Sequence, residues 1–456
     1  MAHVSVDFQK GNGKIKPMHA VNNGPVGSTK EYEAGIASGT RKRSNIDDFR
    51  DAGIPYARTH DASFCPLYGA EHTVDVYYVF PNFDADPTDP ANYDFVCTDE
   101  YLKGMQLADV KCFYRLGHRI EHEIKKYGTM PPKDFQKWAV ICEHIIRHYN
   151  EGWADGYRMD IEYWEIWNEP DLHWNEAPEK RPTWGGTKEQ FFELYHVAAT
   201  HLKKCFPHLK IGGPALAGNW EWAEEFLAQL KAPLDFFSWH CYGHTVEKYL
   251  QKAKIADALL KKYGFENTES ILNEWNYVLG WRGDDIVYSY RIIQGHIKGA
   301  AFVSAVMLAS QNSSIDMLMY YDARNSTVWN GMFGGILKPI LKGYYPFYMF
   351  NVLYQLGTSV EVTSDSVNGF ACAAVGENEA AVMVTHFNDD DTAGEEIFSI
   401  DLLGFGGENG AELEYFVLDE NHDLTPCGKI SYVGERLTLE LPTPNFTSYL
   451  IRIKRK

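Results

Sequence analysis

The stretch Tyr163-Trp-Glu-Ile-Trp167-Asn-Glu-Pro170 shows how this chain is built. It begins with mostly apolar residues, as expected of a strand buried on both faces of a sheet, and a proline ends it. Other short, mostly apolar runs occur at 54–57, 111–116, 209–212, 235–239 and 271–272. Because segments with helical periodicity separate these runs, the sequence predicts βα units and a parallel sheet.

Two of the intervening helices are well marked. Over 131–149, apolar residues recur every three or four positions, and two prolines at the start suit a helix N-terminus. Over 187–206, Thr187 and Gln190 have the spacing of a capping box, and the apolar residues again share one face. We therefore expect amphipathic helices that cover the sheet.

The number of βα units predicts a (β/α)8 TIM barrel over residues 16–357. The strand before Glu169 is about the fourth and the strand ending at Glu274 about the seventh. The two residues are 105 positions apart, which fits three units of about 35 residues. A doubly wound open sheet is the alternative, but no glycine-rich phosphate loop follows the first strand.

The pattern changes after about residue 357. Short β-rich runs separated by Gly, Asn and Asp replace the helical periodicity. We expect an antiparallel β-sandwich accessory domain over residues 358–456. Residues 1–15 contain a further strand-like run that is expected to join it.

Composition excludes several classes of partner. The chain has 456 residues and a formal charge of −19, which argues against binding nucleic acid or an anionic membrane. Eight cysteines without a CxxC pair favour reduced thiols and a cytoplasmic location. No signal-peptide pattern and no apolar run of 18 residues occur. The sequence leaves open whether the protein is secreted or periplasmic and whether it forms a homo-oligomer.

Two glutamates follow or end predicted barrel strands, Glu169 beside Asn168 and Glu274 beside Trp275. The carboxyl ends of barrel strands form the active-site mouth. A lone glutamate there is often a surface charge or a helix cap. Two at one mouth suit cleavage of a glycosidic bond, because one carboxyl protonates the leaving oxygen while the other attacks or stabilises the anomeric carbon. This chemistry requires no cofactor and no metal.

These residues resemble the clan A glycoside hydrolases and, within them, family 39, the family of β-xylosidases and α-L-iduronidases. The resemblance rests on the Trp-Asn-Glu-Pro motif at 167–170 and on the stretches 131–138, 165–172, 207–215, 235–242 and 58–60. It covers the barrel and, in outline, the C-terminal domain. It implies a retaining exo-glycosidase that acts on an oligosaccharide or glycoside, with a β-xyloside as the first expectation.

The resemblance also implies roles for single residues. Glu169 matches the acid/base and Glu274 the nucleophile. The chemistry itself requires Glu169 to be protonated at the start and Glu274 to be ionised near hydrogen-bond donors or a cation. The expected substrate-binding residues are Asn168 at the sugar 2-hydroxyl, Tyr242 at the nucleophile, His240 at the end of the sixth strand, and Arg58 and His60 at the glycone pocket.

Tryptophans are candidate sugar platforms, because the C–H faces of sugars pack on aromatic rings. The candidates are Trp239, Trp275 and Trp329, although each is equally compatible with core packing.

His118 and Arg119 depart from the family's β-xylosidases, which have a carboxylate and apolar residues in this region; Asp61 is a further difference. We expect His118 to line the pocket, where it adds positive charge. An α-L-arabinofuranosidase, an α-L-iduronidase-like activity and a non-catalytic carbohydrate-binding barrel remain alternatives.

Overall fold

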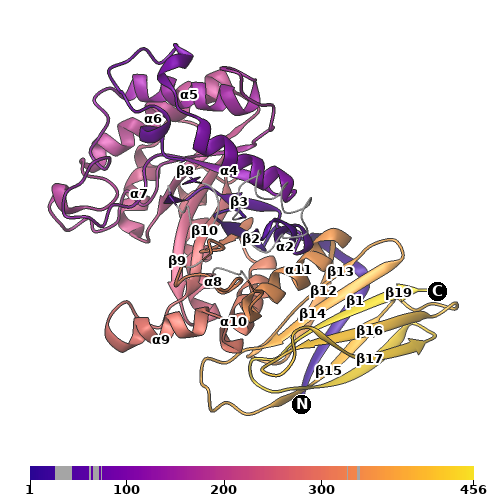
Figure 1. The fold of residues 1–456 in the computed structure, drawn as a ribbon. Coiled ribbons are helices and arrows are strands. Elements are labelled where there is room, and N and C mark those ends of the chain that lie inside the picture. Colours follow the sequence, from indigo (N-terminus) through magenta and orange to yellow (C-terminus); the bar gives the residue numbers. More distant parts are fainter. Residues whose placement is uncertain (26–43, 61–62, 65–70, 73, 326, 336–338) are drawn as a thin grey trace.

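Eight of the described strands form a closed parallel barrel (Figure 1). The computed structural model describes residues 1–25, 44–60, 63–64, 71–72, 74–325, 327–335 and 339–456. The barrel strands are β2 (Ala20–Asn22), β3 (Tyr56–Arg58), β6 (Lys111–Leu116), β7 (Tyr163–Ile166), β8 (Lys210–Leu216), β9 (Phe236–Gly243), β10 (Glu269–Tyr277) and β11 (Met317–Tyr320). Because β11 pairs with β2, the ring closes. The predicted barrel is confirmed and the open sheet is excluded.

A layer of buried apolar side chains, most of them large, fills the barrel interior on the side opposite the mouth. The layer comprises Ala20, Tyr56, Phe113, Tyr163, Phe236, Ile271, Met317 and Met319. Strand β8 contributes no residue to this apolar cluster, and it has Gly212 where a side chain would collide with Phe236. A Cβ at Gly212 would lie 2.2 Å from the Phe236 carbonyl oxygen and 2.6 Å from its ring.

Helices surround the barrel. Those described are α2 (Ile46–Asp51), α3 (Val76–Val79), α4 (Val96–Leu107), α5 (Phe135–Asn150), α6 (Lys188–Cys205), α7 (Trp220–Gln229), α8 (Val246–Lys262), α9 (Gly283–Ile293), α10 (Ile297–Gln311) and α11 (Tyr345–Leu356), with short 3-10 turns at Pro90–Asn92, Pro178–Lys180 and Lys342–Tyr344.

The predicted start is wrong for the first of the two helices and correct for the second. Helix α5 begins at Phe135 rather than at 131, because the Asp134 side chain accepts a hydrogen bond from the Lys137 amide (2.9 Å) and caps the helix there. The two prolines therefore precede the helix. Helix α6 begins after Thr187, which forms the predicted capping box with Gln190.

The C-terminal part forms one nine-stranded sheet in the order β17-β16-β19-β14-β13-β12-β1-β15-β18. Its strands are β1 (Ala2–Lys14), β12 (Thr358–Ser364), β13 (Gly369–Val375), β14 (Glu379–His386), β15 (Glu396–Leu403), β16 (Ala411–Leu418), β17 (Thr425–Tyr432), β18 (Arg436–Thr443) and β19 (Ser448–Arg455). Val6, Ile400 and Leu439 share one hydrophobic cluster with Val382 and Leu413 of distant strands, so the sheet folds over into a sandwich. One pair departs from the antiparallel expectation, because β1 enters between β12 and β15 and runs parallel to β15. A separate two-stranded ribbon joins β4 (Ser63–Phe64) and β5 (Glu71–His72).

Helices α10 and α11 lie between the barrel and this sheet (Figure 1). Helix α10 is apolar and buried around most of its circumference because both neighbours cover it. At its start, Lys298 Nζ lies 3.0 Å from Asp389 and 2.8 Å from Asp391 of the sheet domain. Asp389 also accepts a hydrogen bond from the Tyr277 hydroxyl (2.7 Å), so the sheet domain contacts the last residue of strand β10.

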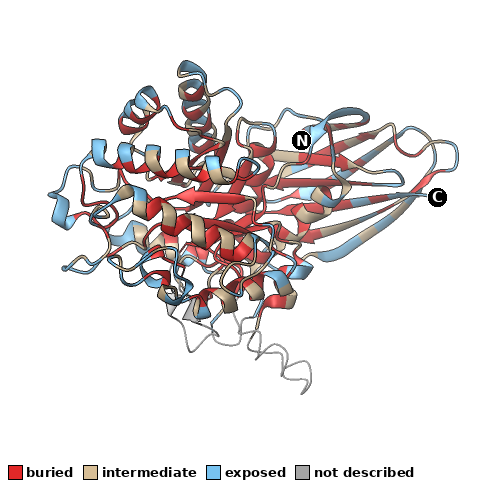
Figure 2. Ribbon diagram, turned by 90° about the horizontal axis from the view of Figure 1, so that it is seen from above, coloured by how far each residue is buried: buried red, intermediate tan, exposed pale blue. Residues whose placement is uncertain are grey.

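Burial follows the layers. The barrel strands are mostly buried, whereas exposed residues lie on loops, on outer helix faces and along strands of the C-terminal sheet such as β17 and β18 (Figure 2). Among the described residues, no single helix has both the length and the apolarity to cross a bilayer; α9 and α10 satisfy those criteria only together, and they are bent by 81°. The seven cysteines in this part of the chain are free thiols, and Cys65 lies outside it.

The barrel core gives a first prediction. Gly212→Ala should lower the free energy of unfolding by about 2 kcal/mol or more, because the added methyl overpacks the site against Phe236. Urea unfolding followed by circular dichroism measures this change in the free energy of unfolding. Gly394→Ala is the control, since no heavy atom lies within 4 Å of the added Cβ, and it should change stability by less than about 0.5 kcal/mol. Equal effects would contradict the packing argument.

Candidate active site

The end of β7 places Asn168 and Glu169 at the barrel mouth. The chain turns sharply there, and Trp167 and Glu169 have left-handed backbone with φ of 74° and 48°. Such values are uncommon outside glycine and occur where the surrounding structure holds the chain. The Trp167 amide donates to the carbonyl of Leu116 (2.7 Å), and the Glu169 amide donates to that of Ala215 (2.8 Å). The segments at the ends of β6 and β8 therefore fix the turn that carries Glu169.

Strand β10 carries Glu274 on a bulge. Its register with β9 shifts between Leu272 and Glu274. Side chains of a regular strand alternate between its two faces, whereas a bulge re-aims one of them. As a result, two consecutive residues face the barrel interior: Asn273 donates to Glu165, and Glu274 contacts His60.

Two of the proposed sugar platforms are wrong. Trp239 and Trp275 are fully buried, and the ring of Trp275 packs against Tyr249 of α8. Their neighbours His240 and Glu274 occupy the barrel interior, so strand alternation turns both indoles outward into the helix layer.

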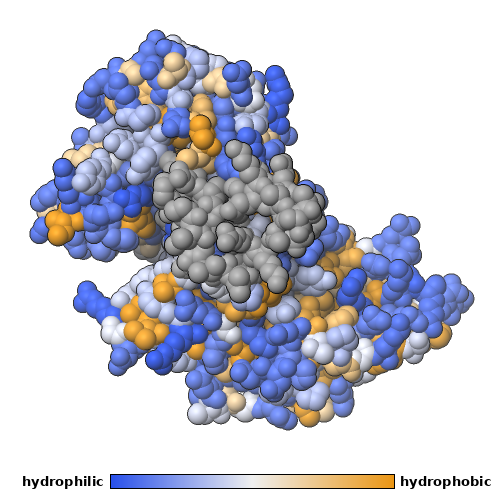
Figure 3. All heavy atoms as spheres, viewed as in Figure 1, coloured by the Kyte–Doolittle hydropathy of each residue, from blue (hydrophilic) through white to orange (hydrophobic). Residues whose placement is uncertain are grey.

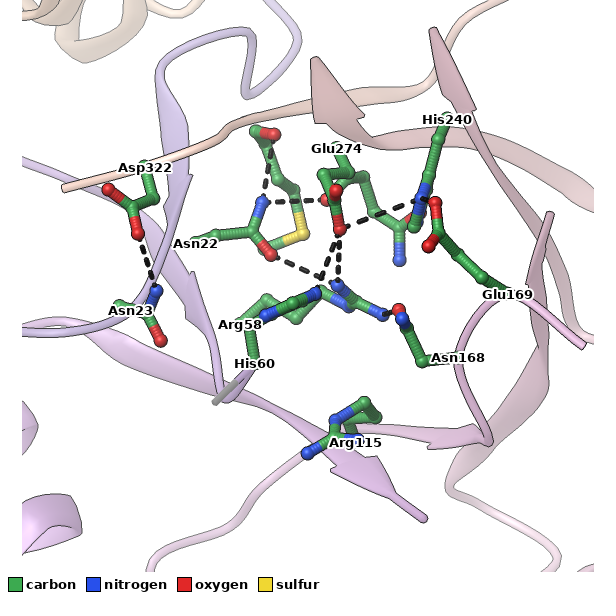
Figure 4. A network of polar contacts seen from close by, with 12 residues as sticks. Asn22, Asn23, Arg58, His60, Arg115, Asn168, Glu169, His240, Glu274 and Asp322 are labelled. Carbon is green, nitrogen blue, oxygen red and sulfur yellow. Dashed lines mark hydrogen bonds and ion pairs between the residues drawn. The ribbon is translucent and has the colours of Figure 1, made fainter. Parts of the chain in front are cut away.

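Glu274 is 4% exposed and surrounded by donors (Figure 4). The Tyr242 hydroxyl donates to Oε1 at 2.5 Å. Oε2 lies 2.9 Å from His60 Nε2 and 3.5 Å from both Arg58 Nη1 and His240 Nδ1. Burial alone would raise the pKa of this carboxyl, but the charges of His240, His60 and Arg58 outweigh burial and lower the pKa to about 2. The site therefore holds Glu274 ionised.

The Tyr242 phenol keeps its proton. Burial raises its pKa well above the usual value, and the adjacent Glu274 charge raises it further. The hydroxyl is thus a permanent donor to the carboxylate.

Glu169 faces Glu274 across His240. Glu169 is 6% exposed, and its Oε1 lies 2.8 Å from His240 Nδ1. One oxygen of each carboxylate and one nitrogen of His240 lie within 4.8 Å of one another. Within the described residues, Nε2 of His240 has no hydrogen-bond partner. The structure thus brings together both glutamates and the histidine that the sequence singled out.

Glu165 was missed by the sequence reasoning, yet it holds Arg58. Arg58 Nε donates to Glu165 Oε2 at 2.6 Å, and both residues are fully buried. Ser238 and Asn273 each donate to Glu165 Oε1 at 2.6 Å. The available signal was the charge itself, because a charged residue in a strand buried on both faces requires a buried partner.

Arg58 in turn orients Asn168. Its Nη2 donates to Asn168 Oδ1 at 2.7 Å, and its Nη1 donates to Asn22 Oδ1 at 3.1 Å. The Nδ2 of Asn168 is buried and has no partner in the described part of the chain. An amide donor beside Glu169 is thus free to bind a ligand hydroxyl.

His118 lies in a different cluster. Its Nε2 is 2.9 Å from Glu121 and its Nδ1 is 3.7 Å from Asp75, which also pairs with Arg115 (2.5 Å). Figure 4 shows Arg115 apart from the glutamate network. No described contact of His118 reaches the two glutamates, so its place at the pocket stays a prediction.

Arg119 also has an acidic partner, Glu123 at 2.7 Å. The positive charge added by this segment is therefore matched by neighbouring carboxylates. Asp61 lies outside the described residues.

Trp329 lies beside the site, unlike the other two tryptophans. Its ring centroid is 5.6 Å from that of Tyr242 and 6.1 Å from that of Tyr321. Tyr321 in turn lies 4.9 Å from the ring of His60. Aromatic rings therefore line one side of the residues that hold Glu274, and Tyr321 is a neighbour that the sequence reasoning did not identify.

Possible cation ligands converge in two places among the described residues. One group is Glu169, His240 and Glu274; the other, on α5 and α6, is Glu143, His201 and Cys205. Hydrogen bonds already join members of each group, including His201 Nε2 to Glu143 Oε2 at 2.6 Å.

A closed parallel barrel with two carboxylates that converge at its mouth is typical of glycosidases built on this fold. Residues 23–276, more than half of the chain, match glycosyl hydrolases family 39, and the chain belongs to this family. The resemblance inferred from the motifs is thus confirmed.

Two relatives are named β-xylosidases. The protein of Geobacillus stearothermophilus is 33% identical over 144 residues, 28% of this chain and 26% of that protein. The protein of Caldicellulosiruptor saccharolyticus is 35% identical over 142 residues, 28% and 27% of the two chains. The matched segments span about a quarter of these relatives. A crystal structure of a glucosidase from Croceicoccus marinus aligns with 100% of this chain and 99% of its own, with a TM-score of 0.77 and 21% identity, which shows a shared fold.

The charge on Glu274 gives a pH-dependent prediction. Its folded-state pKa of about 2 lies below the value near 4.3 of an unfolded glutamate. The resulting stabilisation is present above about pH 4.3 and is lost as the pH falls toward 2. The stability of wild type relative to Glu274→Gln should therefore fall by on the order of 1–2 kcal/mol between pH 6 and pH 3.

Urea unfolding at both pH values measures this change. Glu408→Gln removes an exposed glutamate and serves as the control, with no comparable pH dependence expected. A difference between wild type and Glu274→Gln that stays constant from pH 6 to pH 3 would refute the assigned ionisation.

Proposed function

We propose that this protein is a retaining exo-glycoside hydrolase that removes terminal β-xylosyl residues. The observation that carries the proposal is the pair of buried carboxylates, one held ionised by cations and a tyrosine, the other hydrogen-bonded to a histidine. Non-catalytic sugar binding does not require such a pair.

The spacing of the carboxylates supports retention. One oxygen of Glu169 and one oxygen of Glu274 lie within 4.8 Å of each other. So close an approach favours the short carboxyl separation of retaining enzymes, about 5–5.5 Å, over the roughly 6.5–9.5 Å that admits a water in inverting ones. Glu274 attacks the anomeric carbon while Glu169 protonates the leaving oxygen. In the second step Glu169 takes a proton from water, whose oxygen displaces Glu274 from the sugar.

The hydrogen bonds around Glu274 fit a nucleophile. Cations keep the carboxylate ionised, and the Tyr242 donor occupies Oε1, which leaves Oε2 beside His60 for attack. The free Nδ2 of Asn168 is able to donate to a sugar hydroxyl next to the reacting carbon. Because both glutamates are at most 6% exposed, a terminal sugar suits the site better than the middle of a chain.

Two observations support a xyloside. Two relatives that align with part of this chain at above 30% identity are named β-xylosidases. The positive charges of His118 and Arg119 have the acidic partners Glu121, Asp75 and Glu123, so this segment offers little to an acidic sugar such as an iduronide.

Hydrolysis of p-nitrophenyl glycosides tests the proposal. Wild type should release nitrophenol from the β-xyloside faster than from the α-L-arabinofuranoside, β-glucoside, β-galactoside or α-L-iduronide analogue. Glu274→Ala should lower kcat by about a thousandfold or more, because no nucleophile remains. Glu408→Ala should leave kcat unchanged. Activity that survives Glu274→Ala would overturn the assignment, and a different preferred glycone would replace the xyloside.

The stereochemical course tests the mechanism. Proton NMR should detect the β-anomer of the sugar as the first product of wild type. In Glu169→Ala, sodium azide should restore turnover and yield the β-glycosyl azide, because azide attacks the glycosyl-enzyme without a general base. Glu274→Ala should give no β-glycosyl azide. First release of the α-anomer would contradict retention.

A further inference from the structure

Trp281 is the exposed end of an aromatic rim beside the nucleophile. We define the rim as Trp281, Trp329 and Tyr242. The ring of Tyr242 lies 5.1 Å from that of Trp281 and 5.6 Å from that of Trp329, and the two indoles are 5.9 Å apart. The Trp281 side of the rim is open, because this residue is 58% exposed.

The rim reaches Glu274 directly through Tyr242. Tyr242 donates to Glu274 through its hydroxyl and contacts both indoles through its ring. Trp281 lies between the end of β10, the strand that carries Glu274, and the start of α9. In Figure 3, hydrophobic residues gather in the part of the molecule that α9 occupies in Figure 1.

Polarity separates the bottom of the site from its rim. Around the carboxylates lie the buried donors Asn168 Nδ2 and His240 Nε2, which have no partner among the described residues and suit the hydroxyls of one sugar. The rim offers flat apolar rings instead. Exposure increases outward, from the buried donors through the half-buried Tyr242 and Trp329 to Trp281. A unit bound at the rim therefore lies on the solvent side of the sugar that is attacked.

We propose that Trp281, supported by Trp329, is the platform for the leaving-group sugar. Its indole face packs against the C–H face of that ring, as aromatic side chains pack on other apolar surfaces. This inference rests on the proposed function, and it adds a residue that recognises the departing unit rather than the transferred one.

The test compares two substrates that share a glycone. In xylobiose the leaving group is a sugar; in β-xylosyl fluoride it is a single atom that does not reach the rim. Trp281→Ala should lower kcat/KM for xylobiose about tenfold and leave the value for the fluoride within about twofold. Trp281→Phe should recover part of the loss. Tyr127→Ala is the control at an aromatic residue that is 64% exposed, and it should change neither value.

The outcomes separate the two proposals. An equal loss of kcat/KM for both substrates would mean that Trp281 acts only by positioning Tyr242. No loss of kcat/KM for either substrate would mean that the leaving group does not contact the rim. Each of these results overturns the platform. If wild type cleaves neither substrate, the proposed function fails. Titration calorimetry with xylotriose then decides the platform alone: about tenfold weaker binding to Trp281→Ala supports it, and equal affinity refutes it.

Discussion

The buried ion pair between Arg58 and Glu165 is the interaction on which the site depends. It lies inside the barrel, between strands β3 and β7, and is fully buried. A buried pair is stable only if its remaining polar atoms find partners, and here amide and hydroxyl groups of Asn22, Ser238 and Asn273 provide them. The pair therefore ties together strands that are far apart in the sequence. It also sets the position of the guanidinium group beneath the catalytic mouth.

The same guanidinium links structure to chemistry. One of its nitrogens orients Asn168, and another lies 3.5 Å from Glu274. Together with His60 and His240 it makes the surroundings of Glu274 cationic enough to overcome the cost of burial. Glu169 lacks this surrounding, because its described side-chain partner is His240 alone. Two identical side chains thus occupy different electrostatic environments, which is what a division into acid and nucleophile requires.

The β domain contacts the barrel at strand β10, the strand that carries Glu274. Lys298 and Tyr277 both contact Asp389, which joins the sheet domain to the helix layer and to strand β10. Helices α10 and α11 pack against strands β13 and β14 of the sheet, and Lys342 contacts Asp423. The apolar outward face of β10, which includes Trp275, packs into the same layer. These contacts fix the strand from its outer side while the polar network holds it from within.

The sequence by itself determined the barrel, because apolar runs at βα spacing have few other ways to be buried, and it identified both glutamates from their place at strand ends. It did not place the start of α5, where one aspartate cap outweighed two prolines. Only the tertiary structure decided which side chains face inward. A bulge between Leu272 and Glu274 turns Glu274 to the interior and Trp275 to the helices, and no local pattern encodes that shift. Glu165, Tyr321 and Trp281 likewise gained their neighbours from strands and loops distant in the chain, because contacts across a barrel depend on closure of the whole ring.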